Sequence, residues 1–278
     1  MFMSVGAAKT GTTWLYSMIR DHEDIYFSPE KEINYFAHAN NRDWNLSYQT
    51  RSRLFLNKAK YLKQLPLNEF EKELDWYTRF LSEPINDEWY KDLFTGQQSE
   101  KYIADFSNST CLLNKRGMRH VAKSFNDLKL IYILRDPVER LWSHVKFHLV
   151  WTGQQDLINS WSDNEFINFA KKKHIERQCN YIKNISNMAK SFDENQYKII
   201  FFEYITDRPV YILNQIETFL GIEKRSYENK RVRVAVNKGQ DNPISDNVKH
   251  AYREMLDKQY VGIKELGLNP PDTWNYDL

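Results

Sequence analysis

The chain has 278 residues, of which 41% are apolar and 15% are aromatic, so it can bury a core of the size expected for one large domain. Its 39 basic and 37 acidic side chains leave a net charge of only +2. This balance gives no electrostatic support for a nucleic-acid binder or a polybasic membrane-binding protein. Any activity must therefore arise from a local site.

Two cysteines and seven histidines are present, and their spacing matches neither a disulfide framework nor a metal site. No apolar run approaches the roughly 20 residues that span a bilayer. The first residues, MFMSVG, are typical of a strand and not of a signal peptide. These features predict a cytoplasmic protein without a metal ion or a membrane span.

Strands that alternate with helices are expected along the chain, because continuous apolar runs are followed by segments with helix caps or helical periodicity. Proline after a capping aspartate begins one helix, and glycine ends another. The strands are expected at 2–5, 128–134 and 197–202, with a further short strand at 102–104, and the helices at 12–20, from 136 and at about 209–220.

This order predicts an α/β fold with a central parallel sheet in three layers. The stretch 40–98 differs, because it is rich in Asn, Lys, Glu, Trp and Tyr and has helical patterning at 69–81 and 87–94. We expect it to form a helical insertion on the acceptor side of the domain. No repeat or linker divides the chain, so residues 1–278 are predicted to form a single domain.

The loop GAAKTGTT at 6–13 joins the first strand to the first helix, where backbone N–H groups and the helix dipole favour an anion. Its two glycines have the spacing of the nucleotide-binding loop G-x-x-x-x-G-K-[ST]. Thr12, however, stands where the lysine for the β and γ phosphates belongs, and Lys9 lies inside the loop. The loop therefore suits an anion bound without a metal better than it suits Mg-ATP.

A second polar segment, ILRDPVERLWS at 133–143, ends the 128–134 strand and begins a helix. Arg135 lies where ligands of parallel sheets bind, and its guanidinium suits bidentate phosphate contacts. Ser143 can offer a hydroxyl to the same phosphate. The alternative for Arg135 is an ion pair with Asp136 or Glu139.

The two segments resemble the sulfotransferases that use 3′-phosphoadenosine 5′-phosphosulfate (PAPS): KTGTTW at 9–14 matches the family's 5′-phosphosulfate loop, and 133–143 matches its second motif. The resemblance implies a P-loop-like strand-loop-helix, with Lys238-Gly239 as a further contact to the 3′-phosphate. Trp14 and Tyr181 are candidate stacking surfaces for the adenine, with core packing as the alternative. The residues expected at the donor are Lys9, Thr10, Gly11, Thr12, Thr13, Trp14, Arg135, Ser143, Tyr181, Lys238 and Gly239.

The segment SPEKEINYF at 28–36 resembles an element of the glycan-type sulfotransferases whose glutamate is the catalytic base, and Glu32 is the matching residue. Lys9 and Glu32 are the expected catalytic residues, with Lys9 stabilising the charge on the bridging oxygen. The alternatives are a plain charged loop, or a histidine base as in the phenol and steroid branch, for which His38 and His120 are candidates.

The stretch 102–110 resembles the family's acceptor-lining element without its proline, so Asp105 and Ser107 are candidate contacts to the acceptor or the donor. The predicted reaction moves a sulfuryl group from PAPS to an acceptor hydroxyl and leaves adenosine 3′,5′-bisphosphate. The acceptor is a saccharide, a lipid or another natural product. A saccharide fits a glutamate base and the aromatic residues of the insertion, Trp44, Trp76, Tyr77, Trp89 and Tyr90, but the same surface also suits a lipid or a polyketide. The alternatives are a small-molecule P-loop kinase and a non-catalytic nucleotide- or glycan-binding relative.

Overall fold

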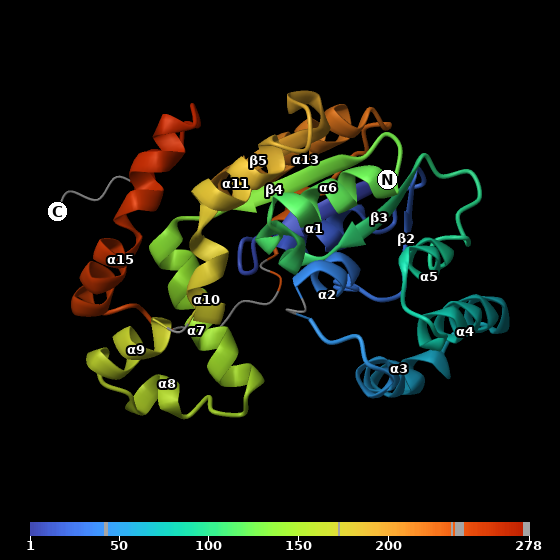
Figure 1. Ribbon diagram of the computed structural model, residues 1–278, viewed down its shortest axis with the longest axis horizontal. Coiled ribbons are helices and arrows are strands. Elements are labelled where there is room, and N and C mark those ends of the chain that lie inside the picture. The colour runs from blue at the N-terminus through green and yellow to red at the C-terminus, as the bar shows by residue number, and fades with distance from the viewer. Residues whose placement is uncertain (42–43, 172, 235, 237–241, 275–278) are drawn as a thin grey trace.

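A five-stranded sheet with the strand order β2-β3-β1-β4-β5 forms the centre of the molecule (Figure 1). The computed structural model describes residues 1–41, 44–171, 173–234, 236 and 242–274. Every neighbouring pair of strands is parallel, as the sequence predicts. The strands are β1 (Phe2–Gly6), β2 (Ile25–Phe27), β3 (Tyr102–Phe106), β4 (Lys129–Leu134) and β5 (Tyr197–Phe201).

Both faces of the sheet are covered, which explains the continuous apolar runs. In β4, Ile131 and Ile133 face one core, and Leu130, Tyr132 and Leu134 face the other. Side chains of α1 (Thr12–Ile19) and α13 (Pro209–Leu220) fill the first core. The second core is filled from α2 (Tyr35–Asn41), α6 (Lys115–Ser124), α7 (Pro137–Trp151), α11 (Tyr181–Ala189) and α15 (Asp246–Glu265). The predicted three layers are therefore present.

Helix caps lie where the sequence predicts them. The Asp136 side chain accepts a hydrogen bond of 2.9 Å from the Glu139 N–H at the start of α7, and Pro137 is the first helical residue. Gly221 ends α13 with a φ of 63°, a left-handed conformation that favours glycine. These local signals fix where α7 begins and where α13 ends.

The predicted insertion consists of α3 (Tyr48–Leu62), α4 (Leu67–Leu81) and α5 (Asp87–Asp92), at the opposite end of the molecule from α15 (Figure 1). Its aromatic side chains pack mainly inward: Trp76, Tyr77, Trp89 and Tyr90 are at most 5% exposed. Trp44, just before α3, is 37% exposed. The expectation that all five rings form a sugar-binding surface is therefore wrong for four of them, because they fill the core.

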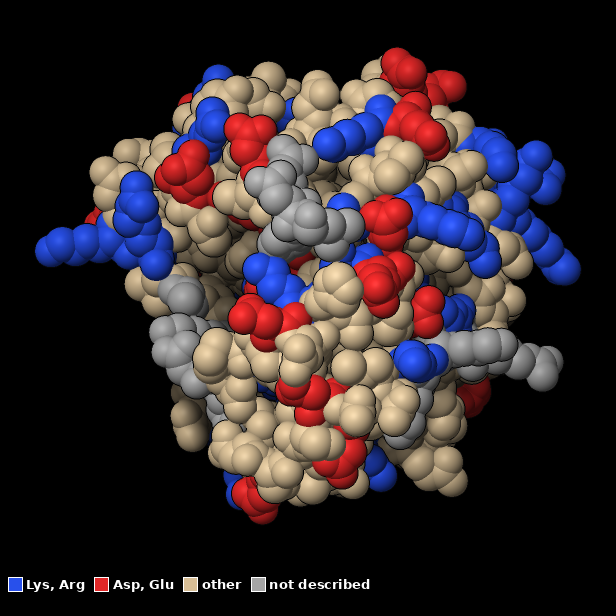
Figure 2. All heavy atoms as spheres, turned by 90° about the vertical axis from the view of Figure 1, so that its left-hand side faces the viewer, with Lys and Arg blue, Asp and Glu red and all other residues tan. Residues whose placement is uncertain are grey.

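The remaining helices connect and flank these layers. They are α8 (Leu157–Ser160), α9 (Asp163–Ala170), α10 (Lys173–Glu176), α12 (Phe202–Asp207) and α14 (Asn229–Val232), with short 3₁₀ helices at Asn108–Leu112, Arg177–Cys179, Glu194–Gln196 and Asp272–Trp274. Within the described ranges, none of the helices has both the length and the apolar character needed to cross a bilayer. Basic and acidic side chains are interspersed on the face shown in Figure 2, as the small net charge suggests.

Candidate active site

Polar and aromatic residues converge at the carboxyl ends of the strands, the edge at which parallel α/β sheets bind ligands. The anion loop, residues 6–11, follows β1, and Glu32 follows β2. Asn108 follows β3, Arg135 follows β4, and Phe202 follows β5. Five segments that are distant in the sequence therefore contribute to one site.

The anion loop depends on its two glycines. Gly6 has a φ of 129°, and a Cβ atom there would lie 2.7 Å from the carbonyl oxygen of Asn108. Gly11 has a φ of 87°, and a Cβ atom there would lie 2.8 Å from the ring of Phe202. No other residue type fits these positions without a shift of the neighbouring segments. Gly11 directly precedes α1, so the free N–H groups of the first helical turn open toward the loop.

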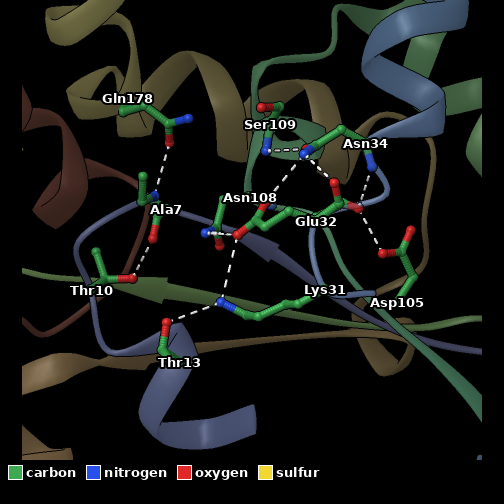
Figure 3. Close-up of polar contacts among 12 residues, drawn as sticks. Ala7, Thr10, Thr13, Lys31, Glu32, Asn34, Asp105, Asn108, Ser109 and Gln178 are labelled. Carbon is green, nitrogen blue, oxygen red and sulfur yellow. Dashed lines mark hydrogen bonds and ion pairs between the residues drawn. The ribbon is translucent and has the colours of Figure 1, made fainter. Parts of the chain in front are cut away.

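Buried side chains hold the loop in place. Gln178 Oε1 accepts from the Ala8 N–H at 3.1 Å (Figure 3). Arg140 Nη1 donates to the Ala8 carbonyl at 3.3 Å. Thr10 is fully buried, and its hydroxyl donates to the carbonyl of Ala7 at 2.7 Å. The predicted donor contact of Thr10 is thus restricted to its main chain, because the hydroxyl points inward.

Lys9 lies among several cations. Burial, followed by the nearby charges of which Arg135 and Arg140 are the largest, lowers the pKa of Lys9 to about 8. Its Nζ atom lies 4.4 Å from the centre of the Phe147 ring. A crowded, partly desolvated ammonium gains most from a bound anion, which neutralises the surrounding positive charge.

Arg135 has two kinds of partner. Its Nη1 atom lies 3.5 Å from the Lys9 carbonyl oxygen, and its Nη2 atom lies 3.4 Å from Glu139 Oε2. Its guanidinium carbon lies 4.9 Å above the Phe202 ring. The ion pair considered as an alternative is therefore real, and Arg135 nevertheless contacts the anion loop.

The Glu32 carboxylate is held by several donors (Figure 3). The Asn108 N–H donates to Oε2 at 2.9 Å, the Asn108 side-chain amide donates to Oε1, and Asn34 Nδ2 donates to Oε2 at 3.4 Å. Burial raises the pKa of Glu32, and the positive charge of Lys31 opposes that rise. A desolvated carboxylate with a raised pKa is a stronger base than a solvated one.

Lys31 connects the carboxylate to the anion loop. Its Nζ atom lies 3.6 Å from Glu32 Oε1 and donates to Thr13 Oγ1 at 3.1 Å (Figure 3). Thr13 belongs to the first turn of α1. The structure therefore brings together the two segments, 9–14 and 28–36, that carry the predicted catalytic residues.

A buried chain of hydrogen bonds supports this carboxylate from the side of β3. The Tyr90 hydroxyl and the Ser107 hydroxyl each donate to Asp105 at 2.6 Å, and the Asn34 N–H donates to the Ser107 oxygen at 2.8 Å. Asp105 and Ser107 are at most 2% exposed. The expectation that these two side chains contact an acceptor or donor is wrong, because they are buried and instead position Asn34 beside Glu32.

The main chain is strained at this site. Four residues other than glycine in the described part of the chain have a positive φ, and three of them are Lys9 (71°), Glu32 (65°) and Asn34 (55°). Such conformations cost about 1–3 kcal/mol each and persist only where the surroundings impose them. They accumulate here at both predicted catalytic residues.

The family of the chain follows from its similarity to known proteins. A model of the sulfotransferase family matches residues 2–226. The chain belongs to the sulfotransferase family. No curated protein sequence is significantly similar to this sulfotransferase-family member.

Solved sulfotransferase structures share its fold. The sulfotransferase of Alicyclobacillus acidocaldarius has a TM-score of 0.66 at 19% identity, over 98% of this chain and 97% of that one. The sulfotransferase domain of the curacin biosynthetic pathway has a TM-score of 0.58 at 16% identity, over 98% of each chain. That of the Synechococcus PCC 7002 olefin synthase has a TM-score of 0.58 at 17% identity, over 97% and 94%.

The two residues predicted to stack on the adenine, Tyr181 and Trp14, are both buried, to different degrees, in this sulfotransferase-family chain. Tyr181 is fully buried, and its hydroxyl donates to the Arg135 carbonyl at 2.9 Å, so its ring offers no face for stacking. Trp14 is 6% exposed and donates to the Val232 carbonyl at 2.8 Å. Its adenine contact stays a prediction.

Phe202 was missed by the sequence analysis. It is partly exposed, and with Arg135 it lines a cavity of about 610 Å³. The signal that points to it is its place directly after β5, at the edge where this fold binds ligands.

The remaining residues predicted to contact the sulfuryl donor lie in α1, in α7 or outside the described residues. Thr12 is buried in the first turn of α1, and Ser143 is partly exposed in α7. Lys238 and Gly239 lie outside the described residues. No group of three or more His, Cys, Asp or Glu side chains suited to a metal ion occurs within the described ranges.

The two histidines considered as rival bases lie elsewhere. His38 Nδ1 lies 3.0 Å from the Trp44 carbonyl oxygen, and His120 Nε2 lies 2.7 Å from Asp87 Oδ1. Both line a second cavity, to which neither Lys9 nor any other residue of the anion loop contributes.

Proposed function

We propose that the protein transfers a sulfuryl group from PAPS to the hydroxyl group of an acceptor and leaves adenosine 3′,5′-bisphosphate. The observation that carries this proposal is the contact of one ammonium, that of Lys31, with both the Glu32 carboxylate at 3.6 Å and Thr13 of the loop-helix junction at 3.1 Å. A proton acceptor is thereby held beside an anion site, as transfer to a hydroxyl group requires.

The donor would be held by the anion loop and its neighbouring cations. Main-chain N–H groups of residues 10–13 and the Lys9 ammonium suit the phosphosulfate, and Arg135 suits the 3′-phosphate. Ser143, Lys238 and Gly239 are proposed as further contacts to the 3′-phosphate from the family resemblance. Thr12, at the position of the lysine of nucleotide-triphosphate loops, argues against a kinase.

These residues account for every bond and proton that changes in the transfer step. The acceptor oxygen forms a bond to sulfur while the bond between sulfur and the phosphate oxygen breaks, and the hydroxyl proton passes to Glu32. Lys9 stabilises the negative charge that develops on the leaving phosphate oxygen. Glu32 is preferred to His38 and His120 as the base because those histidines line the other cavity.

Calorimetric titration tests the donor assignment. We expect adenosine 3′,5′-bisphosphate to bind and Mg-ATP to bind much more weakly. Arg135→Ala should weaken the binding of adenosine 3′,5′-bisphosphate by about tenfold to a hundredfold, because a charged hydrogen-bond donor to phosphate is lost. Arg53→Ala, which changes an exposed arginine of α3, is the control and should bind normally.

Two outcomes would contradict the proposal. Tight binding of Mg-ATP without binding of the bisphosphate would indicate a kinase. Binding of the bisphosphate without transfer of labelled sulfur from PAPS to any acceptor of a broad hydroxyl panel would indicate a non-catalytic relative.

A further inference from the structure

A second cavity, of about 710 Å³, lies where α2, α6 and the start of α5 meet. This volume is within the range of small-ligand pockets. No residue of the anion loop lines it, and neither Glu32 nor Arg135 does. Any ligand bound here is therefore recognised by a different set of side chains from those of the candidate active site.

The polar groups of this cavity are held in fixed orientations. Asp87 Oδ1 accepts hydrogen bonds from the Tyr35 hydroxyl at 2.6 Å and from His120 Nε2 at 2.7 Å. His120 Nδ1 lies 3.0 Å from the Asn40 amide nitrogen, which can only donate, so the ring proton belongs on Nε2. Asp87 Oδ2 forms no side-chain or main-chain hydrogen bond with the described residues, and the Asp87 side chain is 52% exposed.

An indole ring stands beside these groups. Trp44 is 37% exposed, and its carbonyl oxygen lies 3.0 Å from His38 Nδ1, which ties its segment to α2. The other four aromatic residues singled out in the insertion are buried. An exposed tryptophan edged by hydrogen-bonding groups offers an apolar face and polar partners to the same ligand.

The charges of the lining decide between ligand classes. Among the residues that the structure describes, the lining contains no lysine or arginine, and Asp87 is its only carboxylate. The described part of the lining therefore offers no cationic partner to an anion, in contrast to the surroundings of Lys9. Asn45 and Asn86 also line the cavity. Their Oδ1 atoms accept from the main-chain N–H groups of Ser47 and Trp89, so their amide N–H groups are the ones that can bond to hydroxyl groups.

We propose that this cavity binds a neutral saccharide ring, with Trp44 against the C–H face of the sugar and Asp87 accepting from its hydroxyl groups. The proposal does not rest on sulfuryl transfer, because binding here requires neither the donor nor Glu32. It names a second ligand site that the family membership does not imply.

Saturation-transfer NMR with the intact protein tests the pocket, with maltose, cellobiose, lactose and N,N′-diacetylchitobiose as probes. We expect at least one disaccharide to give a signal, Trp44→Ala to weaken its binding at least tenfold, and Asp87→Asn to weaken it several-fold. Trp151→Ala is the matched control, because Trp151 is 73% exposed on α7 and lies outside the pocket. It should bind the sugar normally.

Three results would contradict the proposal that this cavity binds a sugar. They are the absence of a signal with all four sugars, an unchanged signal in Trp44→Ala, and displacement of the sugar by saturating adenosine 3′,5′-bisphosphate, which would place it in the anion site. The circular dichroism spectrum of each variant confirms that it is folded. Titration with the bisphosphate alone still tests the proposed function, so the two can fail separately.

Discussion

The anion loop and the carboxylate segment lie at the same edge of the sheet but depend on different features of the sequence. The loop requires glycine at positions 6 and 11, where the main chain has conformations that other residues avoid, and buried side chains then hold it in place. The carboxylate segment owes its position to side chains, with Asn34 and Ser107 in a hydrogen-bonded chain beside Glu32. Changes in the first should therefore alter stability and donor binding, and changes in the second should alter the rate.

The largest effect is expected for Lys9→Ala. Loss of the ammonium that we propose stabilises the leaving phosphate should lower kcat/KM for the donor by about a thousandfold, since one electrostatic contact to a developing charge contributes that much. The rate is measured as release of adenosine 3′,5′-bisphosphate with an accepted hydroxyl compound. Lys190→Ala, an exposed lysine at the end of α11, is the control. A Lys9→Ala rate within threefold of the wild type would exclude this role.

Glu32→Gln should lower kcat by about a thousandfold, the middle to upper range for loss of a general base. Titration should show unchanged affinity for adenosine 3′,5′-bisphosphate, because the amide fills the same space and the loop is not altered. Glu265→Gln, at the exposed end of α15, should have no effect. Full turnover by Glu32→Gln would move the base to a histidine.

Gly6→Ala tests the loop itself. Its Cβ atom would lie 2.7 Å from a main-chain oxygen, and its φ of 129° disfavours alanine. We expect the free energy of unfolding to fall by about 3 kcal/mol and donor binding to be lost. Gly153→Ala has a φ of 72° but no atom within 4 Å of the new Cβ, and should cost only about 1 kcal/mol. Equal costs in urea unfolding would show that the close approach at Gly6 is not decisive.

Ser107→Ala should act on the rate and leave donor binding intact. It removes the acceptor of the Asn34 N–H, so Glu32 is held less firmly, and we expect kcat to fall about tenfold with an unchanged KM for PAPS. Ser109→Ala is the matched control, because Ser109 contacts Asn34 only through its main-chain N–H at 3.3 Å. A rise in KM with normal kcat would place Ser107 in donor binding instead.

The smallest expected effect is the gradual change of kcat/KM with pH. Glu32 must be deprotonated to accept a proton, and burial raises its pKa, so the rise of kcat/KM with pH should be centred at a higher pH than the ordinary glutamate pKa. Lys9 must be protonated, so kcat/KM should fall as the pH passes its pKa of about 8. In Lys9→Arg the alkaline fall should move to higher pH, because a guanidinium stays charged. An alkaline limb that does not move would assign it to another group.

Where the signal is local, the strands β1, β3, β4 and β5 and the helices α1, α7 and α13 were predicted to within about two residues, whereas the edge strand β2 was not predicted. Apolar runs identified β1, β4 and β5, and the cap of Asp136-Pro137 and the stop at Gly221 marked helix ends. The helices α3, α6 and α11 were not predicted. In α6 only Gly117, Met118 and Val121 are buried, on one face of a helix that is otherwise strongly polar, so its amphipathic pattern depends on few apolar residues.

The sequence by itself determined the anion loop and Arg135, because a strand, a glycine loop and a helix are adjacent in the chain and need no distant partner to be recognised. Only the tertiary structure decided which side chains face a ligand. In the folded protein Tyr181 and the hydroxyl of Thr10 are buried, and Phe202 is partly exposed. The Asn108 N–H donates a hydrogen bond to Glu32. Burial and side-chain pairing depend on segments far apart in the sequence, and these meet only when the sheet brings its strand ends together.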